Sequence, residues 1–472
     1  MEIEGKDEGV RSLGSFIGTP EYVKREIISR IDTKAKPLLE LAVKMRNSHA
    51  AWEIIKRVPA ITGLDYIFRT TPPHLTDSAC DHFDTLLRDA FERGVVGARM
   101  EQEEWEMAQL PFPMGWNLTP SRVKALAAYT ASLNSHRDDI ARLYPGCRAQ
   151  IDATLNELEK QINADVTLTA TTRQRDITKA MMKANALKFA NHSNMRVRAL
   201  YKSQCDPHAV AYKSAPVRPY LFFESDEFQI TARRSLGMDI AKQRLQCDCE
   251  QQLDPKADHE CALNGAWVKR HNALRNLAHE VACEGFIESK LELTGTFPPE
   301  CSRCQETLSS EKHNCKKPDE RSLKPSKQTY RGDQFIDAVP GVTLRKTLVD
   351  FTVKNEFLPT YLPLSAEKLG AAAELGEKEK NDKFKRRVEK LGYDFLAVSC
   401  DSMGSVRPQA QDFFNYLIGQ RAIHKGMSFA ESASLFWHKW SFIIHRENAR
   451  NILTRYRTII CHQPTRKTSL YM

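Results

Sequence analysis

The sequence predicts an α+β protein of several domains, mostly helical, with one small α/β domain in its second half. Three observations support this prediction. Residues 12 to about 160 carry helix-start signals and apolar residues at helical spacing. Between residues 331 and 400, short runs rich in β-branched and aromatic residues have the pattern of strands. Beyond Gly404 the apolar spacing is helical again, so we expect a helical C-terminal region.

The clearest helix start is Thr19 followed by Pro20, because a threonine side chain can cap the first amide groups and proline fits the first helical position. The apolar residues that follow at helical spacing are Val23, Ile27 and Ile31. Further helices are predicted over residues 50–58, 78–91 and 122–133.

Three strands are predicted in the α/β part, over residues 335–339, 347–353 and 393–398. A long polar helix over about 365–391 separates the last two. Strands interrupted by a helix are typical of a mixed or parallel sheet.

The composition limits the class of protein. The chain has 472 residues, a net charge of +9 and 12 cysteines. A basic balance favours an anionic partner such as nucleic acid, although a merely basic protein is equally compatible with it. No apolar run reaches the roughly 18–20 residues that span a bilayer, so no membrane partner is expected. The first ten residues are polar and acidic, unlike a signal peptide, so we expect a nuclear or other intracellular protein that is not secreted.

Clustered cysteines in a reducing compartment indicate metal binding before disulfides. Two Cys/His clusters have the ligand types of structural Zn²⁺ sites. The first consists of Cys247, Cys249, His259 and Cys261, and the second of Cys301, Cys304, His313 and Cys315. One-residue spacing within three of the four pairs is tighter than usual, so incidental cysteines remain an alternative for both clusters.

Two aspartates are the strongest candidates for catalysis. Asp350 lies inside the predicted strand 347–353, and Asp333 comes just before the strand 335–339. A carboxylate in a buried strand is costly unless it is paired or bound to metal. Two carboxylates on adjacent strands can hold Mg²⁺, which activates water for phosphodiester hydrolysis. The alternative is a salt bridge at a strand end.

Sites of this kind generally also use a lysine. Lys354 shares the strand face of Asp350, but four residues of strand rise place it about 13 Å away. Lysines on the following helix are therefore better candidates, with Lys380 preferred for catalysis and Lys383 for contact with nucleic acid. Each could equally be a solvated lysine on a charged helix.

A further acidic candidate is Glu280, which lies near the apolar stripe of Leu274, Leu277 and Val281. It could point toward the same catalytic site, although a solvated glutamate is the simpler interpretation. The basic insert over 312–331 has few apolar residues, so we expect a flexible loop that contacts phosphates. With Lys383, the predicted nucleic-acid-binding residues are Arg270, His271, Lys316, Lys317, Lys324, Lys327 and Arg331.

In this order the motifs resemble the C-terminal region of non-long-terminal-repeat retrotransposon proteins, which contains a restriction-like endonuclease. The motifs are a Cys/His knuckle, Arg270-His271-Asn272, Asp333, Asp350-x-Thr-Val, Lys380-x-x-Lys383-Phe384 and Gly392-Tyr393-Asp394-Phe395. Upstream, residues 13–18 are similar to the segment after the reverse-transcriptase palm, and residues 66–73 to the thumb and linker. The sequence departs from the family in its short His-x-Cys spacing and in Phe384, where tyrosine is common.

The resemblance implies a domain order. Residues 1–160 would be a helical thumb and linker region, and 161–245 a basic helical linker. Residues 246–404 would contain the zinc knuckle and the restriction-like endonuclease, with a Cys/His-rich insert at about 296–330. Residues 405–472 would form a helical C-terminal region.

The resemblance also implies an activity, which is Mg²⁺-dependent nicking of target DNA whose 3′ end primes reverse transcription. Element RNA would be a second partner. The only Asp-Asp pair, Asp138-Asp139, lies in a helical context, so we do not expect this chain to polymerise DNA by itself. Two alternatives remain, a catalytically inactive nucleic-acid-binding remnant and a zinc-binding interaction protein. The sequence predicts neither the oligomeric state nor the DNA target.

Overall fold

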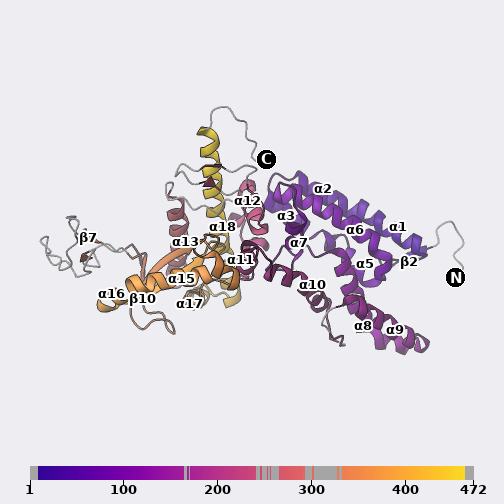
Figure 1. The fold of residues 1–472 in the computed structure, drawn as a ribbon. Coiled ribbons are helices and arrows are strands. Elements are labelled where there is room, and N and C mark those ends of the chain that lie inside the picture. The colour runs from indigo at the N-terminus through magenta and orange to yellow at the C-terminus, as the bar shows by residue number, and fades with distance from the viewer. Residues whose placement is uncertain are drawn as a thin grey trace. The chain divides into compact units, whose positions relative to one another are not determined.

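The fold comes from a computed structural model of the chain (Figure 1). The structure describes residues 9–163, 167–169, 171–240, 245–246, 252–253, 256, 265–292, 300–301, 327–328 and 332–462. The chain divides into two compact units. The helical unit is Met1–His259 with Asn448–Met472, and the sheet unit is Glu260–Glu447. Each unit is described by itself.

The helical unit begins with an antiparallel hairpin of β1 (Gly9–Ser12) and β2 (Ser15–Gly18). Its longer helices are α1 (Pro20–Arg30), α2 (Lys36–Lys44), α3 (Ser48–Ile55), α5 (Leu64–Thr70), α6 (Pro73–Phe91), α7 (Gln102–Gln109), α8 (Ser121–Leu143), α9 (Arg148–Ile162), α10 (Gln174–Ala190), α11 (Met195–Gln204) and α12 (Ser225–Leu236). Shorter elements are the one-turn α4 (Val58–Ile61) and the two-residue strands β3 (Leu245–Gln246) and β4 (Gln252–Leu253).

Helix α1 begins as the sequence predicts. The Thr19 hydroxyl accepts a hydrogen bond from the Tyr22 amide, and Pro20 is the first helical residue. The apolar stripe of Val23, Ile27 and Ile31 is buried. The predicted helices over 50–58, 78–91 and 122–133 fall within or largely overlap α3, α6 and α8.

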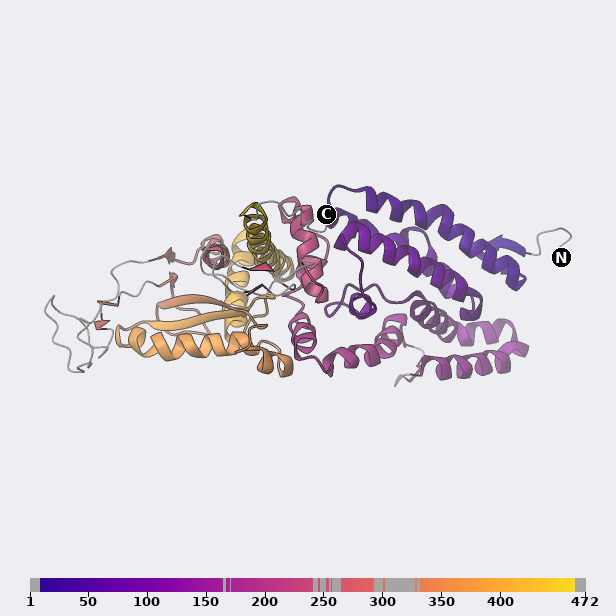
Figure 2. The ribbon, with the colours of Figure 1, turned by 45° about the horizontal axis from the view of Figure 1, so that its top comes forward.

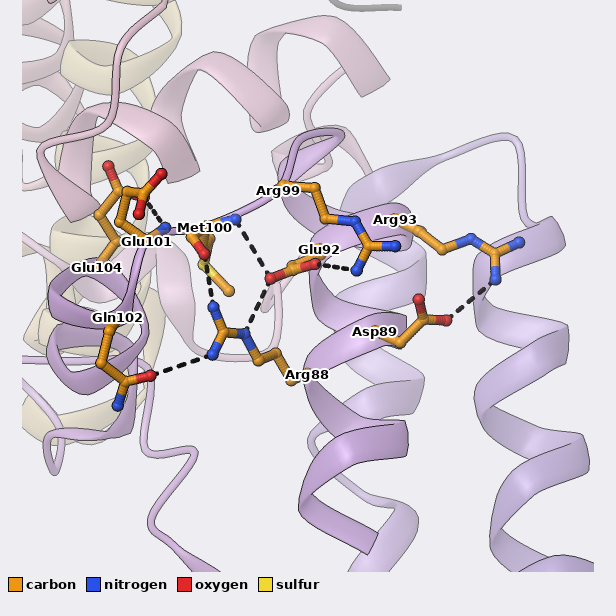
Figure 3. Close-up of polar contacts among 9 residues, drawn as sticks. All are labelled: Arg88, Asp89, Glu92, Arg93, Arg99, Met100, Glu101, Gln102 and Glu104. Carbon is orange, nitrogen blue, oxygen red and sulfur yellow. Dashed lines mark hydrogen bonds and ion pairs between the residues drawn. The ribbon is translucent and has the colours of Figure 1, made fainter. Parts of the chain in front are cut away.

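A buried carboxylate closes the connection between α6 and α7 (Figure 3). Glu92, in a π-helical turn that continues α6, accepts hydrogen bonds from Arg88 at 2.9 Å and from the Met100 amide at 3.2 Å. Its second oxygen pairs with Arg99 at 3.0 Å. A charge removed from water is tolerated only when it is paired and hydrogen-bonded, and Glu92 meets both conditions. The contacts fix the loop that leads into α7.

The sheet unit contains one helix before its sheet, α13 (Ala266–Glu284), and the strands β5 (Ser289–Leu291), β8 (Gln334–Ile336), β9 (Thr347–Lys354) and β10 (Asp394–Asp401). Between β9 and β10 lie α14 (Leu362–Glu367), α15 (Ala371–Lys380), a π-helical turn over Asn381–Lys385 and α16 (Arg386–Lys390). After β10 come α17 (Pro408–Lys425) and α18 (Phe429–His462), whose residues from Asn448 belong to the helical unit. A two-residue pair, β6 (Glu300–Cys301) and β7 (Lys327–Gln328), lies between β5 and β8 in the chain.

The sheet has the order β10-β9-β8-β5, with β10 parallel to β9 and the other neighbours antiparallel. Val349 and Phe351 of β9 enter a large core with α13, α17 and α18. Leu348 faces the other way and packs against Phe384 and Val388. In Figure 2 the orange helices α15 and α16 run along this second face. The predicted α+β class is confirmed, and the sheet lies between two helical layers.

The predicted strands are confirmed with small shifts of their ends, but the helix predicted over 365–391 is wrong in its continuity. It is divided between α14, α15, the π-helical turn and α16. The break falls at Gly370, whose φ of 70° is a left-handed conformation that glycine adopts without steric cost. The finer domain boundaries at 160, 245 and 404 stay predictions. Among the described residues, no helix has the length and apolarity needed to cross a membrane.

Candidate active site

Asp350 lies on β9, which has β10 on one side and β8 on the other. The first five residues of this strand are all buried, and only 4% of Asp350 is exposed. The Asp350 carboxylate forms an ion pair with the Lys380 ammonium at 2.6 Å. The sequence therefore predicted correctly that Lys380, rather than a residue of the strand, lies beside this carboxylate.

Asp333 precedes β8 and is fixed by two contacts. Its Oδ1 lies 3.0 Å from Nε2 of His271, on α13. Its Oδ2 accepts a hydrogen bond from the Phe351 amide at 2.7 Å. Because Phe351 follows Asp350 in the strand, the second bond brings Asp333 to the same part of β9. The two predicted carboxylates therefore meet.

The two carboxyl groups interact directly, since each changes the pKa of the other. Burial, together with the charge of Asp333, raises the pKa of Asp350 to about 6 against the lowering effect of Lys380. Burial also acts to raise the pKa of Asp333, but hydrogen bonds from His271 and the Phe351 amide outweigh it, and that pKa is lowered. Carboxyl groups whose pKa values are pushed apart in this way are typical of catalytic sites.

The position of Lys380 follows from how closely α15 lies on the sheet. Ala371, Ala372 and Ala373 are buried in its first turn. A Cβ atom on Gly376 would lie 2.6 Å from the Ser399 hydroxyl and 2.8 Å from Cγ of Lys354, so glycine permits the close approach. Lys380 is the last residue of this helix, and its side chain reaches Asp350 from above the second face of the sheet.

Lys354 has a different partner, as the strand rise predicted. Its ammonium pairs with Glu379 on α15 and lies 5.7 Å from the centre of the Tyr361 ring. Among the lysines considered for the site, Lys380 is therefore the one in contact with a candidate carboxylate. Lys383 is exposed and lies over the Phe384 ring, with 5.0 Å between its ammonium and the ring centre.

The structure does not bring Glu280 to the carboxylates. Its side chain is 51% exposed and pairs with Lys439 at 2.7 Å. The residue of α13 that reaches the site is His271, which the sequence analysis assigned to nucleic acid. Nine residues separate the two, which is two and a half helical turns, so they lie on opposite sides of the helix. Arg270 is buried, with 4% exposed, which does not fit its predicted surface contact with nucleic acid.

The predicted zinc ligands and most of the basic insert lie outside the described residues. This applies to Cys247, Cys249, His259, Cys261, Cys304, His313 and Cys315, and to Lys316, Lys317, Lys324 and Arg331. Cys301 and Lys327 are described by their backbone, where they face each other in the pair of β6 and β7. Within the described ranges, no group of three or more His, Cys, Asp or Glu side chains could hold a metal ion. Zinc binding stays a prediction.

The donor set at the two aspartates fits Mg²⁺ better than Zn²⁺. Mg²⁺ is usually held by one or two carboxylates, while water and substrate phosphate supply its other oxygen ligands. Structural Zn²⁺ takes four protein ligands of nitrogen or sulfur type, which this site does not contain. A divalent cation would also offset the repulsion between the two adjacent carboxylates, which have little contact with water.

The chain matches no model of a known protein family, and a search of curated proteins finds no significant match. The function therefore has to be argued from the site itself.

Proposed function

We propose that the sheet unit is a metal-dependent DNA endonuclease that nicks one strand, within a retrotransposon-derived protein. The observation that carries this proposal is the contact of the Asp350 carboxyl with two groups, the carboxyl of Asp333 and the ammonium of Lys380. DNA would be the substrate and element RNA a second partner, in the nucleus.

Each group has a role in phosphodiester hydrolysis. Asp333 and Asp350 would hold Mg²⁺, which supplies Lewis-acid stabilisation of the phosphate charge and a water of lowered pKa. The water oxygen bonds to phosphorus and the bond from phosphorus to the 3′ oxygen breaks, leaving a 3′ hydroxyl and a 5′ phosphate. Lys380 donates a hydrogen bond to the attacking water or to a phosphate oxygen, and His271 keeps Asp333 in its orientation.

Two features weigh against the alternative of a zinc-binding interaction protein. That alternative predicts no mixed strands between residues 331 and 400, whereas β8, β9 and β10 form a mixed sheet there. It also gives no functional reason for a carboxylate in the middle of a buried strand, where burial is costly unless the charge is paired or bound to metal. Elemental analysis for zinc tests the metal content of all the candidates, with two ions per chain expected if both clusters are occupied.

The test is nicking of supercoiled plasmid with and without Mg²⁺ by the full chain and by the Asp350→Ala variant. We expect the unchanged protein to produce open circles only with Mg²⁺, and the variant to produce none. Glu280→Gln is the matched control, because Glu280 is the predicted carboxylate that lies away from the site. Equal nicking by the unchanged protein and Asp350→Ala would refute the proposal, provided that circular dichroism shows both to be folded.

A second candidate is an inactive remnant that binds nucleic acid without cleaving it. One observation favours it, which is that three of the four oxygens of the two carboxylates already contact a cation, an imidazole or an amide within the chain. Lys380 contacts Asp350, while His271 and the Phe351 amide contact Asp333. The remnant predicts binding of DNA that weakens with salt, no nicking by the unchanged protein and no effect of Mg²⁺.

A further inference from the structure

The helical unit contains a large cavity with a basic lining. Its volume is about 1970 Å³, which is larger than the pockets of roughly 300–1,000 Å³ that hold small molecules. Residues of α3, α5, α8 and α10 line it, together with the loop over 111–119. Eight lysines and arginines face two aspartates in this lining, so its potential is positive.

Several of these cations have no acidic partner and are free to bind an anion. In the part of the chain that the structure describes, no ion pair is formed by Arg69, Arg173, Lys179 or Lys183. Lys179 and Lys183 are exposed, so their ammonium groups are accessible without any rearrangement. Lys213, in contrast, donates hydrogen bonds to the Gly115 carbonyl and the Gln204 side chain, so its ammonium group is already bound within the protein.

The cations of α10 are regularly spaced. Arg175, which pairs with the adjacent Asp176 at 3.5 Å, is followed every four residues by the unpaired Lys179 and Lys183, so the three lie along one side of the helix with an axial step of about 6 Å. This step is comparable to the distance between successive phosphates of an extended single strand. A row of cations at such a spacing suits a polymer of phosphates better than a single phosphate group.

An accessible aromatic ring lies in the same lining. Phe112 belongs to the loop over 111–119 and is 43% exposed, whereas most aromatic side chains of this unit are buried. Bases of a single strand stack on such rings whatever their sequence, while the bases of a duplex are covered by their neighbours. A basic helix and an exposed ring in one cavity therefore favour an unpaired strand.

We propose that this cavity binds a single-stranded segment of nucleic acid, with phosphates along α10 and a base against Phe112. This proposal does not depend on the nuclease, because every residue that carries it lies in the helical unit. RNA and DNA have the same phosphate and base chemistry here, so the experiment distinguishes them.

The experiment measures binding by fluorescence anisotropy, without Mg²⁺, to labelled 20-nucleotide oligouridylate and oligothymidylate. The full chain is compared with the double variant Lys179→Ala and Lys183→Ala. We expect this variant to bind at least about tenfold more weakly. With two cations fewer, the protein neutralises fewer phosphates, so fewer counterions are released from the nucleic acid on binding. The matched control is Lys34→Ala with Lys36→Ala, two exposed lysines of the same unit that do not line the cavity. It should bind like the unchanged protein.

A second variant tests the base contact. Phe112→Leu keeps an apolar side chain but removes the ring, and it should weaken binding about fivefold without changing the salt dependence. Stronger binding of oligouridylate or of oligothymidylate identifies RNA or DNA as the preferred strand. Either preference supports the proposal that the cavity binds a single strand. The proposal is overturned if the two double variants bind equally. It is also overturned if a 20-base-pair duplex or polyglutamate binds as tightly as the oligonucleotides and depends on Lys179 and Lys183 in the same way.

Discussion

The carboxylate site of the sheet unit and the basic cavity of the helical unit use charge in opposite ways. At the site, the buried Asp350 contacts both Asp333 and Lys380, so its pKa depends on both neighbours. In the cavity, Lys179 and Lys183 lie a helical turn apart and are exposed, so each acts almost independently. A substitution at the site should therefore be all-or-none, whereas substitutions in the cavity should have graded, salt-dependent effects.

The largest expected effect breaks the contact at the site. Lys380→Met should reduce plasmid nicking at least about 100-fold, because it removes the donor beside the reacting phosphate. Lys390→Met is the control, since Lys390 is an exposed lysine on the neighbouring α16 and should nick at the normal rate. A similar loss in both variants would show that the basic helix acts only through its overall charge, as in the cavity.

The next largest effect is the pH dependence of stability that Asp350 causes. The pKa of Asp350 is about 6 in the folded protein against an ordinary value of 3.8, so the folded state binds this proton more tightly. The group therefore contributes stability below pH 4, and this contribution is lost as the pH rises through 6. Asp350→Asn removes the titration and should raise the free energy of unfolding by ~1–3 kcal/mol at pH 7.5, with a smaller gain near pH 4.

Urea unfolding of Asp350→Asn and the unchanged protein at both pH values, without Mg²⁺, measures this difference. If Asp350→Asn is less stable than the unchanged protein at pH 7.5, the contacts of the charged Asp350 outweigh the cost of its burial, and this aspartate does not destabilise the fold. Lys179→Ala is the control, because it keeps Asp350, and its stability should therefore change with pH as that of the unchanged protein does.

The cavity is tested through salt. Removing Lys179 and Lys183 should reduce the slope of log affinity against log salt by about 1.4, which is about 0.7 for each phosphate contact with a single strand. The slope comes from the oligonucleotide titrations at four salt concentrations. An unchanged slope with a weaker affinity would show that the two lysines shape the cavity without contacting phosphates.

The smallest expected effect is that of Glu280→Gln, which should change nicking by less than about twofold. Glu280 is half exposed and pairs with Lys439, and surface ion pairs contribute about 0–1 kcal/mol. His271→Gln is the informative comparison, because it changes the residue of the same helix that contacts Asp333. A larger loss of nicking in Glu280→Gln than in His271→Gln would reverse the assignment of these two residues.

Local patterns predicted most of the sheet unit. The alternation in β9 and the rise per strand residue were enough to place Asp350 inside the sheet and to favour Lys380 over Lys354. The contact between His271 and Asp333 joins residues 62 positions apart, and no local pattern reports it. The helical period could have shown that His271 and Glu280 lie on opposite sides of α13, but not which of them faces the sheet.

The cavity was harder to predict for the same reason. Its free cations come from α5, α10 and the residue before α10, and more than 100 residues separate Arg69 from Lys179. Only the row along α10 is visible in the sequence, where a basic helix is more often a solvated surface. The zinc clusters are the reverse case, since they are conspicuous in the sequence but fall outside the described residues.

The position of Asp350 has a consequence for how such a gene would decay. A charged carboxylate in the middle of β9 lowers stability at neutral pH, so most replacements by a neutral residue would favour the fold. If the sheet unit is the nuclease proposed above, drift would remove this aspartate early once nicking ceased to be selected, while the neighbouring core residues would persist. Related sequences would then date the loss of the proposed activity, because Asp350 would disappear before Val349 or Phe351.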